Sequence, residues 1–154
     1  MLAYTNGAVN AHVPFPVVDG RWRYIGRTVF TIVHATLHLP RSITWAGMTE
    51  ADRSAVRNAL AALRHHEVGQ VRVAATEVAR LNSLPRTVTP DALVYRHTEM
   101  RRQSAGLAAI AEAQRAYDAQ TDRGRRQDRA SSTLAGPRTE IPCRAAHGSA
   151  LNRQ

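Results

Sequence analysis

The segment from Thr49 to about Leu81 constrains the fold most, because it is typical of one long amphipathic helix. Its start, Thr49-Glu50-Ala51-Asp52, resembles a capping box with Asp in the usual Glu position. Apolar residues then recur at helical spacing, at Val56, Leu60 and Leu63. The pattern breaks at Ser83-Leu84-Pro85, where proline cannot continue a helix. The sequence therefore predicts a helix that ends close to residue 81.

This helix carries His66-Glu67-Val68-Gly69-Gln70, which is the H-E-x-x-H motif with its last residue replaced. In the intact motif, two histidines on one helix face bind zinc, and the glutamate activates a bound water. Here Gln70 takes the second ligand position, and its neutral amide oxygen matches Zn²⁺ poorly. His66 and Gln70 share a face with Leu63, so we expect that face to point inward.

The remaining pattern predicts a second helix and a small sheet. The second helix is expected to begin at Thr89-Pro90-Asp91 and to end before Gly124. Residues 27–39 are rich in β-branched side chains and form the best strand candidate. Residues 17–18 and 22–25 are expected to pair with that strand as a hairpin around Asp19-Gly20. The predicted class is α+β, with a small N-terminal antiparallel sheet packed on two long helices.

Length and composition indicate one domain with a basic tail. The 154 residues suit a single core, which we assign to residues 1–127, and residues 128–154 lack periodicity and are expected to be a flexible basic tail. The formal net charge is +9, and all 21 basic residues are arginine. Aromatics make up only 5% and no binding module is evident, so a nucleic-acid partner is not expected.

The sequence also gives an indication of the cellular compartment of the protein. Cys143 is the only cysteine, which excludes an internal disulfide and a cysteine-based zinc site. The N-terminal residues have neither the basic nor the apolar region of a signal peptide. No segment approaches the ~20 apolar residues of a membrane span. We therefore expect a cytoplasmic protein without a membrane partner.

Two blocks of residues carry a family resemblance. The first is His66-Glu67-Val68-Gly69, and the second is Tyr117-Asp118-Ala119-Gln120-Thr121-Asp122-Arg123-Gly124-Arg125 after the second helix. In order and spacing the chain resembles the bacterial domain-of-unknown-function family 922, whose members are predicted secreted zinc proteases. That family has H-E-x-G-H in the first block and Y-D-x-x-T-x-H-G-R in the second. The resemblance covers roughly residues 15–127 and implies a zincin-like fold.

The resemblance also shows where this chain departs from the family. His66 matches the first zinc ligand and Glu67 the general base, whereas Gln70 replaces the second histidine. Arg123 stands where the downstream histidine, the third ligand, belongs. A guanidinium there would place a permanent positive charge at the metal position, where it could pair with Glu67. We therefore expect no metal cofactor.

The candidate site residues follow from these matches. We expect Glu67 and His66 to be catalytic acid/base groups. Expected substrate-binding residues are Gln70, Arg123, Tyr117, His38 and His34. His34 and His38 lie at even spacing on the predicted strand and so share one face, which is also typical of an exposed strand edge. His65 is expected to be exposed, and His97 is a weaker candidate for an alternative site.

Three functions remain open from the sequence. The first is a metal-independent acid/base enzyme that cyclises, isomerises or eliminates from a small-molecule biosynthetic intermediate, because loss of the metal removes the hydrolytic water but leaves proton transfer. The second is a non-catalytic pseudo-protease that binds a ligand or partner in the old cleft. The third is a zinc-dependent hydrolase with substituted ligands, which alone would need zinc.

Overall fold

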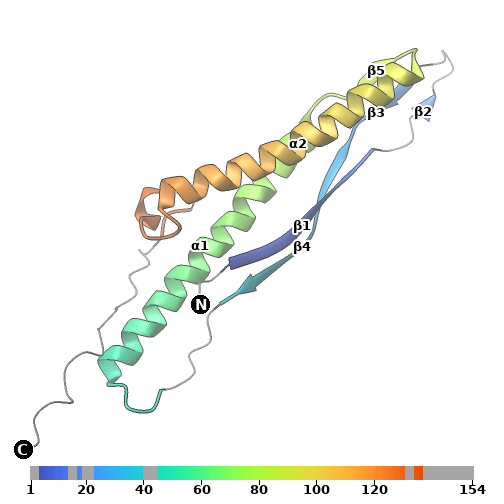
Figure 1. Cartoon of the computed structure of the whole chain (residues 1–154). Helices are drawn as coiled ribbons and strands as arrows, with labels where there is room; N and C mark the ends of the chain where they lie inside the picture. The colour runs from blue at the N-terminus through green and yellow to red at the C-terminus, as the bar shows by residue number, and fades with distance from the viewer. Residues whose placement is uncertain (1–3, 14–16, 19–22, 40–44, 131–133, 137–154) are drawn as a thin grey trace, which may run out of the picture.

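The chain folds into two long helices with a narrow β-ribbon against them (Figure 1). The computed structural model describes residues 4–13, 17–18, 23–39, 45–130 and 134–136. Together these residues form the expected α+β architecture, with two long helices and two small antiparallel sheets whose strands come mainly from the N-terminal part of the chain. Within the described residues, no helix combines the length and apolarity that crossing a membrane requires.

The two helices begin at well-formed caps. Helix α1 spans Glu50–Ser83, and Thr49 caps it with the predicted capping box, in which the Thr49 side chain accepts from the Asp52 amide. Helix α2 spans Ala92–Thr121. Its cap is Asp91, whose carboxylate accepts from the amides of Leu93 and Val94, two residues beyond the predicted start. α1 thus ends two residues after the predicted limit, and α2 ends before Gly124 as predicted.

The predicted strand at residues 27–39 is β4, Val29–His38, but its partner is a strand that the sequence did not single out. That partner is β1, Tyr4–His12, which pairs antiparallel with β4 along its whole length. A register shift between Ala8 and Val9 introduces a β-bulge in the middle of this two-stranded ribbon. The ribbon has no further strand on either side among the described residues.

The predicted hairpin forms, but it belongs to a separate sheet. Strand β2, Val17–Val18, pairs with β3, Tyr24–Gly26, and β3 pairs in turn with β5, Thr87–Thr89. The expectation that the hairpin joins residues 27–39 is therefore wrong. The physical reason lies at Thr28, whose backbone N–H donates to the buried carboxylate of Glu99 and so leaves the ladder before β4 begins. The turn Asp19-Gly20 lies outside the described residues.

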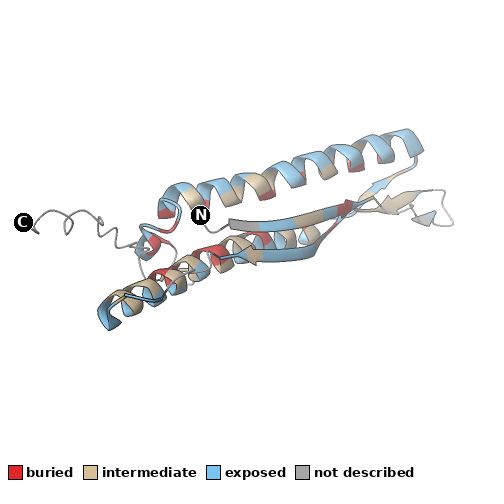
Figure 2. Ribbon diagram, turned by 60° about the horizontal axis from the view of Figure 1, so that its bottom comes forward, coloured by how far each residue is buried: buried red, intermediate tan, exposed pale blue. Residues whose placement is uncertain are grey.

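The core lies where the ribbon crosses the helices. Its buried members come from both layers: Ala11, Phe30, Ala74, Leu81 and Ile110. Figure 2 shows the buried positions on the sides of α1 and α2 that face the ribbon, while the outer side of α2 is exposed. A Cβ at Gly106 would overlap the Phe30 ring, so glycine lets α2 approach the ribbon closely.

Two polar side chains fasten the ribbon to the helices. Asn82, near the end of α1, accepts from the backbone N–H of Phe30 at 2.9 Å and donates to its carbonyl at 2.8 Å. Glu99 on α2 is 0% exposed and accepts from the Thr28 amide, the Thr28 hydroxyl and the Thr87 hydroxyl. These contacts hold β4 against α1, and Thr28 and β5 against α2.

Candidate functional site

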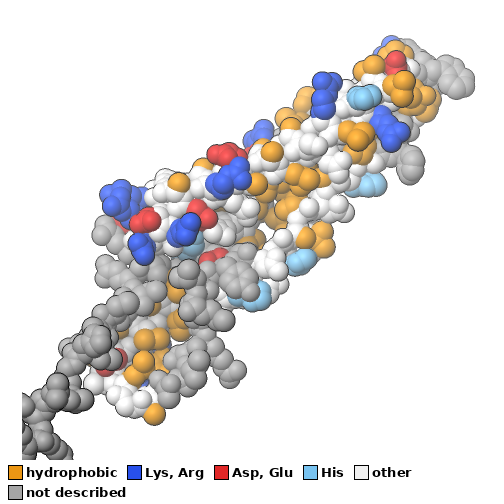
Figure 3. Space-filling view, in the orientation of Figure 1, with side chains coloured by type: hydrophobic (Ala, Val, Ile, Leu, Met, Phe, Trp, Pro, Cys, Tyr) orange, Lys and Arg blue, Asp and Glu red, His pale blue; other side chains and the backbone are white. Residues whose placement is uncertain are grey.

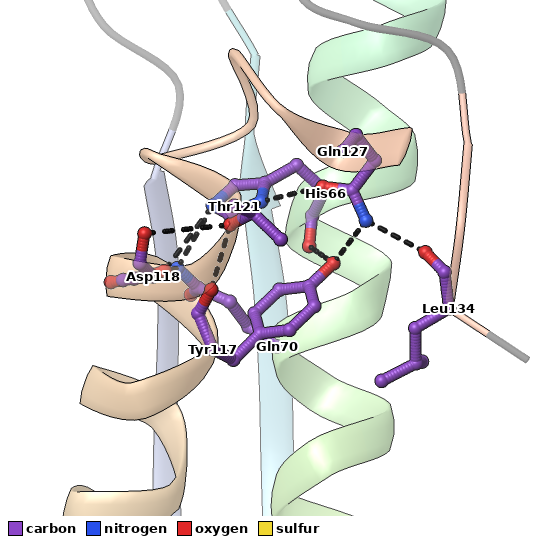
Figure 4. Close-up of polar contacts among 7 residues, drawn as sticks. All are labelled: His66, Gln70, Tyr117, Asp118, Thr121, Gln127 and Leu134. Atoms are coloured by element: carbon purple, nitrogen blue, oxygen red, sulfur yellow. Dashed lines mark hydrogen bonds and ion pairs between the residues drawn. The ribbon is translucent and has the colours of Figure 1, made fainter. Parts of the chain in front are cut away.

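The two blocks of the sequence motif meet at the end of α2. Because α2 runs antiparallel to α1, its last turn, from Tyr117 to Thr121, lies beside His66 in the middle of α1 (Figure 4). A short 3-10 helix, η1 (Gln127–Arg129), and the segment 134–136 complete the site from the C-terminal side. We call His66, Gln70, Tyr117, Asp118, Thr121 and Gln127 the His66 network.

A left-handed turn brings η1 back onto the site. Asp122 and Arg123 have φ values of 48° and 51°, and Gly124 has 91°. Such values are uncommon outside glycine and reverse the chain within three residues. The amide of Arg126 then donates to the Thr121 carbonyl at 2.7 Å, which closes the turn. This reversal places the Gln127 side chain beside Nδ1 of the His66 ring.

Gln127 fixes one side of the His66 ring. Its amide nitrogen donates to the Tyr117 hydroxyl at 2.6 Å and to the Leu134 carbonyl at 2.7 Å. Both hydrogens are thereby used, so its amide oxygen faces Nδ1 of His66 at 3.0 Å. An oxygen acceptor there requires a hydrogen on Nδ1. The Thr121 hydroxyl lies 3.4 Å from the same nitrogen.

The other side of the ring meets Asp118 and Gln70. Nε2 of His66 lies 3.3 Å from Oδ1 of Asp118. The Gln70 amide nitrogen donates to that same oxygen at 2.8 Å and lies 3.5 Å from Nε2. A proton on Nε2 would therefore face a carboxylate, while a lone pair there would face an amide N–H.

Solvent reaches the network at Asp118 and Gln70, whose side chains are partly exposed. His66 is 3% exposed, Tyr117 is 4%, and Thr121 and Gln127 are 0%. The Asp118 side chain is 36% exposed. The carboxylate of Asp118 is therefore the accessible end of a chain of hydrogen-bonding groups that runs inward through His66 to Gln127.

Tyr117 stacks on the His66 ring and packs on α1. The ring centroids are 5.2 Å apart with an interplanar angle of 11°. A Cβ at position 69 would overlap the phenol hydroxyl, so Gly69 is needed for this close approach. Burial raises the pKa of Tyr117, the hydrogen bond from Gln127 lowers it, and the charges of Asp118 and Glu67 raise it further. The phenol is thus held in its protonated form at neutral pH.

Glu67 and Arg123 lie in different surroundings. Glu67 is 4% exposed, and its charge is near enough to Tyr117 to raise the pKa of the phenol. The Arg123 side chain is exposed, on the outside of the left-handed turn. Among the ion pairs between described residues, none joins Arg123 to Glu67.

The candidate histidines differ in burial and in whether they belong to the His66 network. His66 points inward, as its helix face predicted. His65, expected to be exposed, is partly buried, and its Nε2 lies 3.1 Å from the Leu134 carbonyl. His34 and His38 are exposed on β4, and His97 is exposed on α2, so none of these three belongs to the His66 network.

Three members of the His66 network were not predicted as site residues from the sequence. Asp118 and Thr121 stood inside the second matching block, so a signal for them was present. Gln127 had no such signal, because only the left-handed turn brings it over His66. Leu134 and Gly136 lie in the predicted tail, yet the Gly136 amide donates to the Gln127 carbonyl at 3.3 Å. Residues 137–154 of that tail lie outside the described residues.

The donor set at this site does not fit zinc. Zinc in an H-E-x-x-H helix takes a lone pair from each residue of the i, i+4 pair. Here Gln70 presents amide hydrogens, which its bond to Asp118 fixes in orientation. Within the described residues, no group of three His, Cys, Asp or Glu side chains could hold a metal ion. The donors instead hydrogen-bond one another, and Nε2 of His66 faces the Asp118 carboxylate.

Comparison with known proteins identifies a family. The model of the family described as "Bacterial protein of unknown function (DUF922)" matches residues 4–124. The chain therefore belongs to this family, as the two motif blocks predicted, and the match begins before the residues on which the resemblance rested. No curated protein and no solved structure matches the chain significantly. Gln127 and Leu134 lie beyond the matched range, so part of the His66 network is built from residues outside the family model.

Proposed function

We propose that this DUF922 protein is a metal-independent acid/base enzyme that acts on a small-molecule intermediate by isomerisation, cyclisation or elimination. Such reactions need a positioned base and a way to return the proton, but no activated water. The observation that carries the proposal is the half-exposed carboxylate of Asp118, held at one oxygen by Gln70 and backed by Nε2 of His66.

In this proposal Asp118 is the group that meets the substrate. One of its oxygens lies against Gln70 and His66, and the side chain still reaches solvent. Nε2 of His66 faces that carboxylate and can take over or return the proton, while Gln127 holds Nδ1. The proposal therefore gives the role of contacting the substrate to Asp118. His66 and Glu67, which were predicted first, are both almost fully buried.

The buried carboxylate of Glu67 remains part of the proposal. Carboxylates are rarely buried without a partner or a task, and this one lies near the Tyr117 phenol. We propose that its charge adds to the effect of burial in raising the pKa of the phenol above the ordinary value of about 10, so that Tyr117 serves as a hydrogen-bond donor and not as a base. The substrate-binding roles proposed for Arg123 and His38 have no contact with the network to support them.

One observation favours a second candidate, a non-catalytic binding protein. Four members of the network are at most 4% exposed, and their polar groups satisfy one another. A network of that kind can replace the metal as the link between α1 and α2 without performing chemistry. The two candidates differ in whether Asp118 supports turnover.

The test uses the untagged full chain, dialysed against a chelator and incubated in D₂O with small-molecule extracts of bacterial cultures. Mass spectrometry then follows compounds that gain deuterium or change retention. We expect conversion by the wild-type protein that Asp118→Asn abolishes and that added chelator leaves unchanged. Glu67→Gln is run in parallel to test the buried carboxylate.

The matched control is Asp122→Asn. Asp122 lies four residues from Asp118, is exposed, and has a left-handed conformation that asparagine also adopts readily. Full conversion by Asp118→Asn, or loss of conversion on chelation, would overturn the proposal. No conversion of any compound would leave the binding protein as the better account.

We propose a cytoplasmic location for this activity. A single cysteine, Cys143, leaves no internal disulfide to maintain, which suits a reducing compartment. The substrate in this proposal is a small molecule. Fractionation of cells that express the native gene, followed by immunodetection, tests the location independently of the activity.

A further inference from the structure

A cavity opens between the β-ribbon and the two helices, one helical turn from the His66 network. Its volume is about 210 Å³. The ribbon contributes residues 6–9 together with Ile32, His34 and Ala35, and the helices contribute Val71, Ala74 and Gln114. The cavity thus has walls from four separate elements, β1, β4, α1 and α2.

Helix geometry links this cavity to Asp118. Gln70 and Ala74 are four residues apart on α1, and Gln114 and Asp118 are four apart on α2. Residues at that spacing share a helix face and lie about one turn, ~5–6 Å, apart. The cavity therefore lies about one helical turn from Gln70 on α1 and from Asp118 on α2.

The walls are uncharged. The polar side chains are those of Asn6, His34 and Gln114, and the other lining residues are Gly, Ala, Val and Ile. Among the described residues, no arginine, aspartate or glutamate lines it, although the chain holds 21 basic and 12 acidic residues. Figure 3 shows the charged side chains over the outer face of α2, with uncharged groups and histidines along the ribbon. A charged ligand would lose hydration in the cavity without gaining a counter-charge.

The ribbon is irregular at this place. The register shift between Ala8 and Val9 lies in the cavity wall. Bulges of this kind redirect side chains and recur beside functional sites. A Cβ at Gly7 would come within 3.0 Å of the His34 carbonyl, so the two strand backbones approach closely just where His34 lines the cavity.

We propose that this cavity binds a small uncharged molecule with carbonyl or amide groups, which Asn6, His34 and Gln114 hydrogen-bond and which projects toward Asp118. The amides of Asn6 and Gln114 each offer a donor and an acceptor, which matches a neutral carbonyl compound. The volume is below the roughly 300–1,000 Å³ of drug-sized sites, so the ligand or its inserted part is small. The inference rests on the proposed function, because it names the substrate class of that site.

The test compares three probes of one shape: benzamide, which is neutral, benzoate, which is negative, and benzylammonium, which is positive. Each is titrated into the ¹⁵N-labelled full chain while amide chemical shifts are followed by NMR. We expect benzamide to shift the amides of residues 6–9, His34 and Gln114, with a dissociation constant on the order of 1–10 mM. The net charge of +9 favours benzoate non-specifically, so a preference for benzamide would come from the cavity itself.

Two substitutions control for location. Ala35→Leu fills the cavity from an exposed position and should abolish the benzamide shifts, while Thr36→Leu, next to it and outside the lining, should keep them. Stronger binding of benzoate, unchanged binding to Ala35→Leu, or shifts elsewhere would overturn the inference. The absence of shifts with all three probes would also overturn it.

The outcome is separable from that of the proposed function. Asp122→Asn, at an exposed residue outside the His66 network and outside the lining, should bind benzamide as the wild type does. If benzamide binds and no compound is converted, the cavity inference stands and the enzyme proposal fails. If conversion occurs and Ala35→Leu converts as well as the wild type, the enzyme proposal stands and the cavity inference fails.

Discussion

The side-chain oxygen of Gln127 lies 3.0 Å from Nδ1 of His66, although the two residues are 61 positions apart in the chain. This contact joins α1 to the turn that follows α2 and determines which His66 nitrogen carries a hydrogen in the neutral ring. The stability of the network should therefore depend on Gln127.

The first prediction concerns that residue. Gln127→Leu keeps the volume but removes the partners of His66 Nδ1, the Tyr117 hydroxyl and the Leu134 carbonyl. Because a buried polar group left unsatisfied costs ~1–3 kcal/mol, we expect the free energy of unfolding in urea to fall by at least that amount. Gln120→Leu, at an exposed site that bonds only the Arg129 carbonyl, should change it much less. Equal effects of the two substitutions would contradict this role.

The second prediction is a pH dependence that comes from Tyr117. Burial raises the pKa of its phenol above the ordinary value of about 10, so the unfolded chain loses this proton first as the pH rises. The stabilisation is complete below pH ~10 and is lost as the pH rises through the pKa of the folded state. The difference in unfolding free energy between the wild type and Tyr117→Phe should therefore shrink in alkaline solution.

Ultraviolet titration of phenolate absorbance provides a direct check on Tyr117. In the folded wild type, one step of phenolate absorbance should occur above the ordinary pKa of about 10, and Tyr117→Phe should remove it. Tyr95→Phe serves as the comparison, because burial also raises the pKa of Tyr95 but its ring lies outside the His66 network. A Tyr117→Phe titration identical to that of the wild type would count against the buried, protonated phenol.

The third prediction tests the polar link at Glu99. Its carboxylate is 0% exposed, accepts from Thr28 and Thr87, and lies 3.2 Å from the guanidinium of Arg102. Removing one partner of a buried pair costs about 3 kcal/mol or more, so Glu99→Gln should lower the unfolding free energy by roughly that amount. Glu112→Gln breaks an exposed pair of the same i, i+3 spacing and should have a small effect in the same thermal or urea melt. Similar losses for both variants would show that Glu99 does not fasten Thr28 and β5 to α2.

The fourth prediction concerns the backbone at Arg123. A left-handed conformation costs a residue with a large side chain roughly 1–2 kcal/mol, and asparagine tolerates it better. Arg123→Asn should therefore stabilise the fold by up to about 1 kcal/mol in chemical denaturation. Arg125→Asn, which is also exposed but is not among the residues with positive φ, should give no such gain. A loss of stability in Arg123→Asn would instead mean that the guanidinium makes a stabilising contact.

Local signals in the sequence predicted most of the helical part of the fold. Thr49 and Asp52 form a capping box within three residues, and Pro85 follows the end of α1, so both limits depend on nearby residues alone. The inward face of His66 followed in the same way from the helical spacing that places it on one side with the apolar Leu63. Such features are decided by short-range hydrogen bonds and side-chain periodicity, which a linear sequence displays directly.

What the sequence by itself determined was the presence of two capped helices, a strand at residues 27–39 and the two motif blocks. Only the tertiary structure decided that β4 pairs with β1, because strand pairing depends on contacts between distant segments. The left-handed turn at Asp122 and Arg123 likewise brought Gln127 over His66 and left Asp118 as the accessible carboxylate. The physical reason is common to both: burial and partner choice depend on how α1, α2 and the ribbon pack together, and no local pattern encodes that packing.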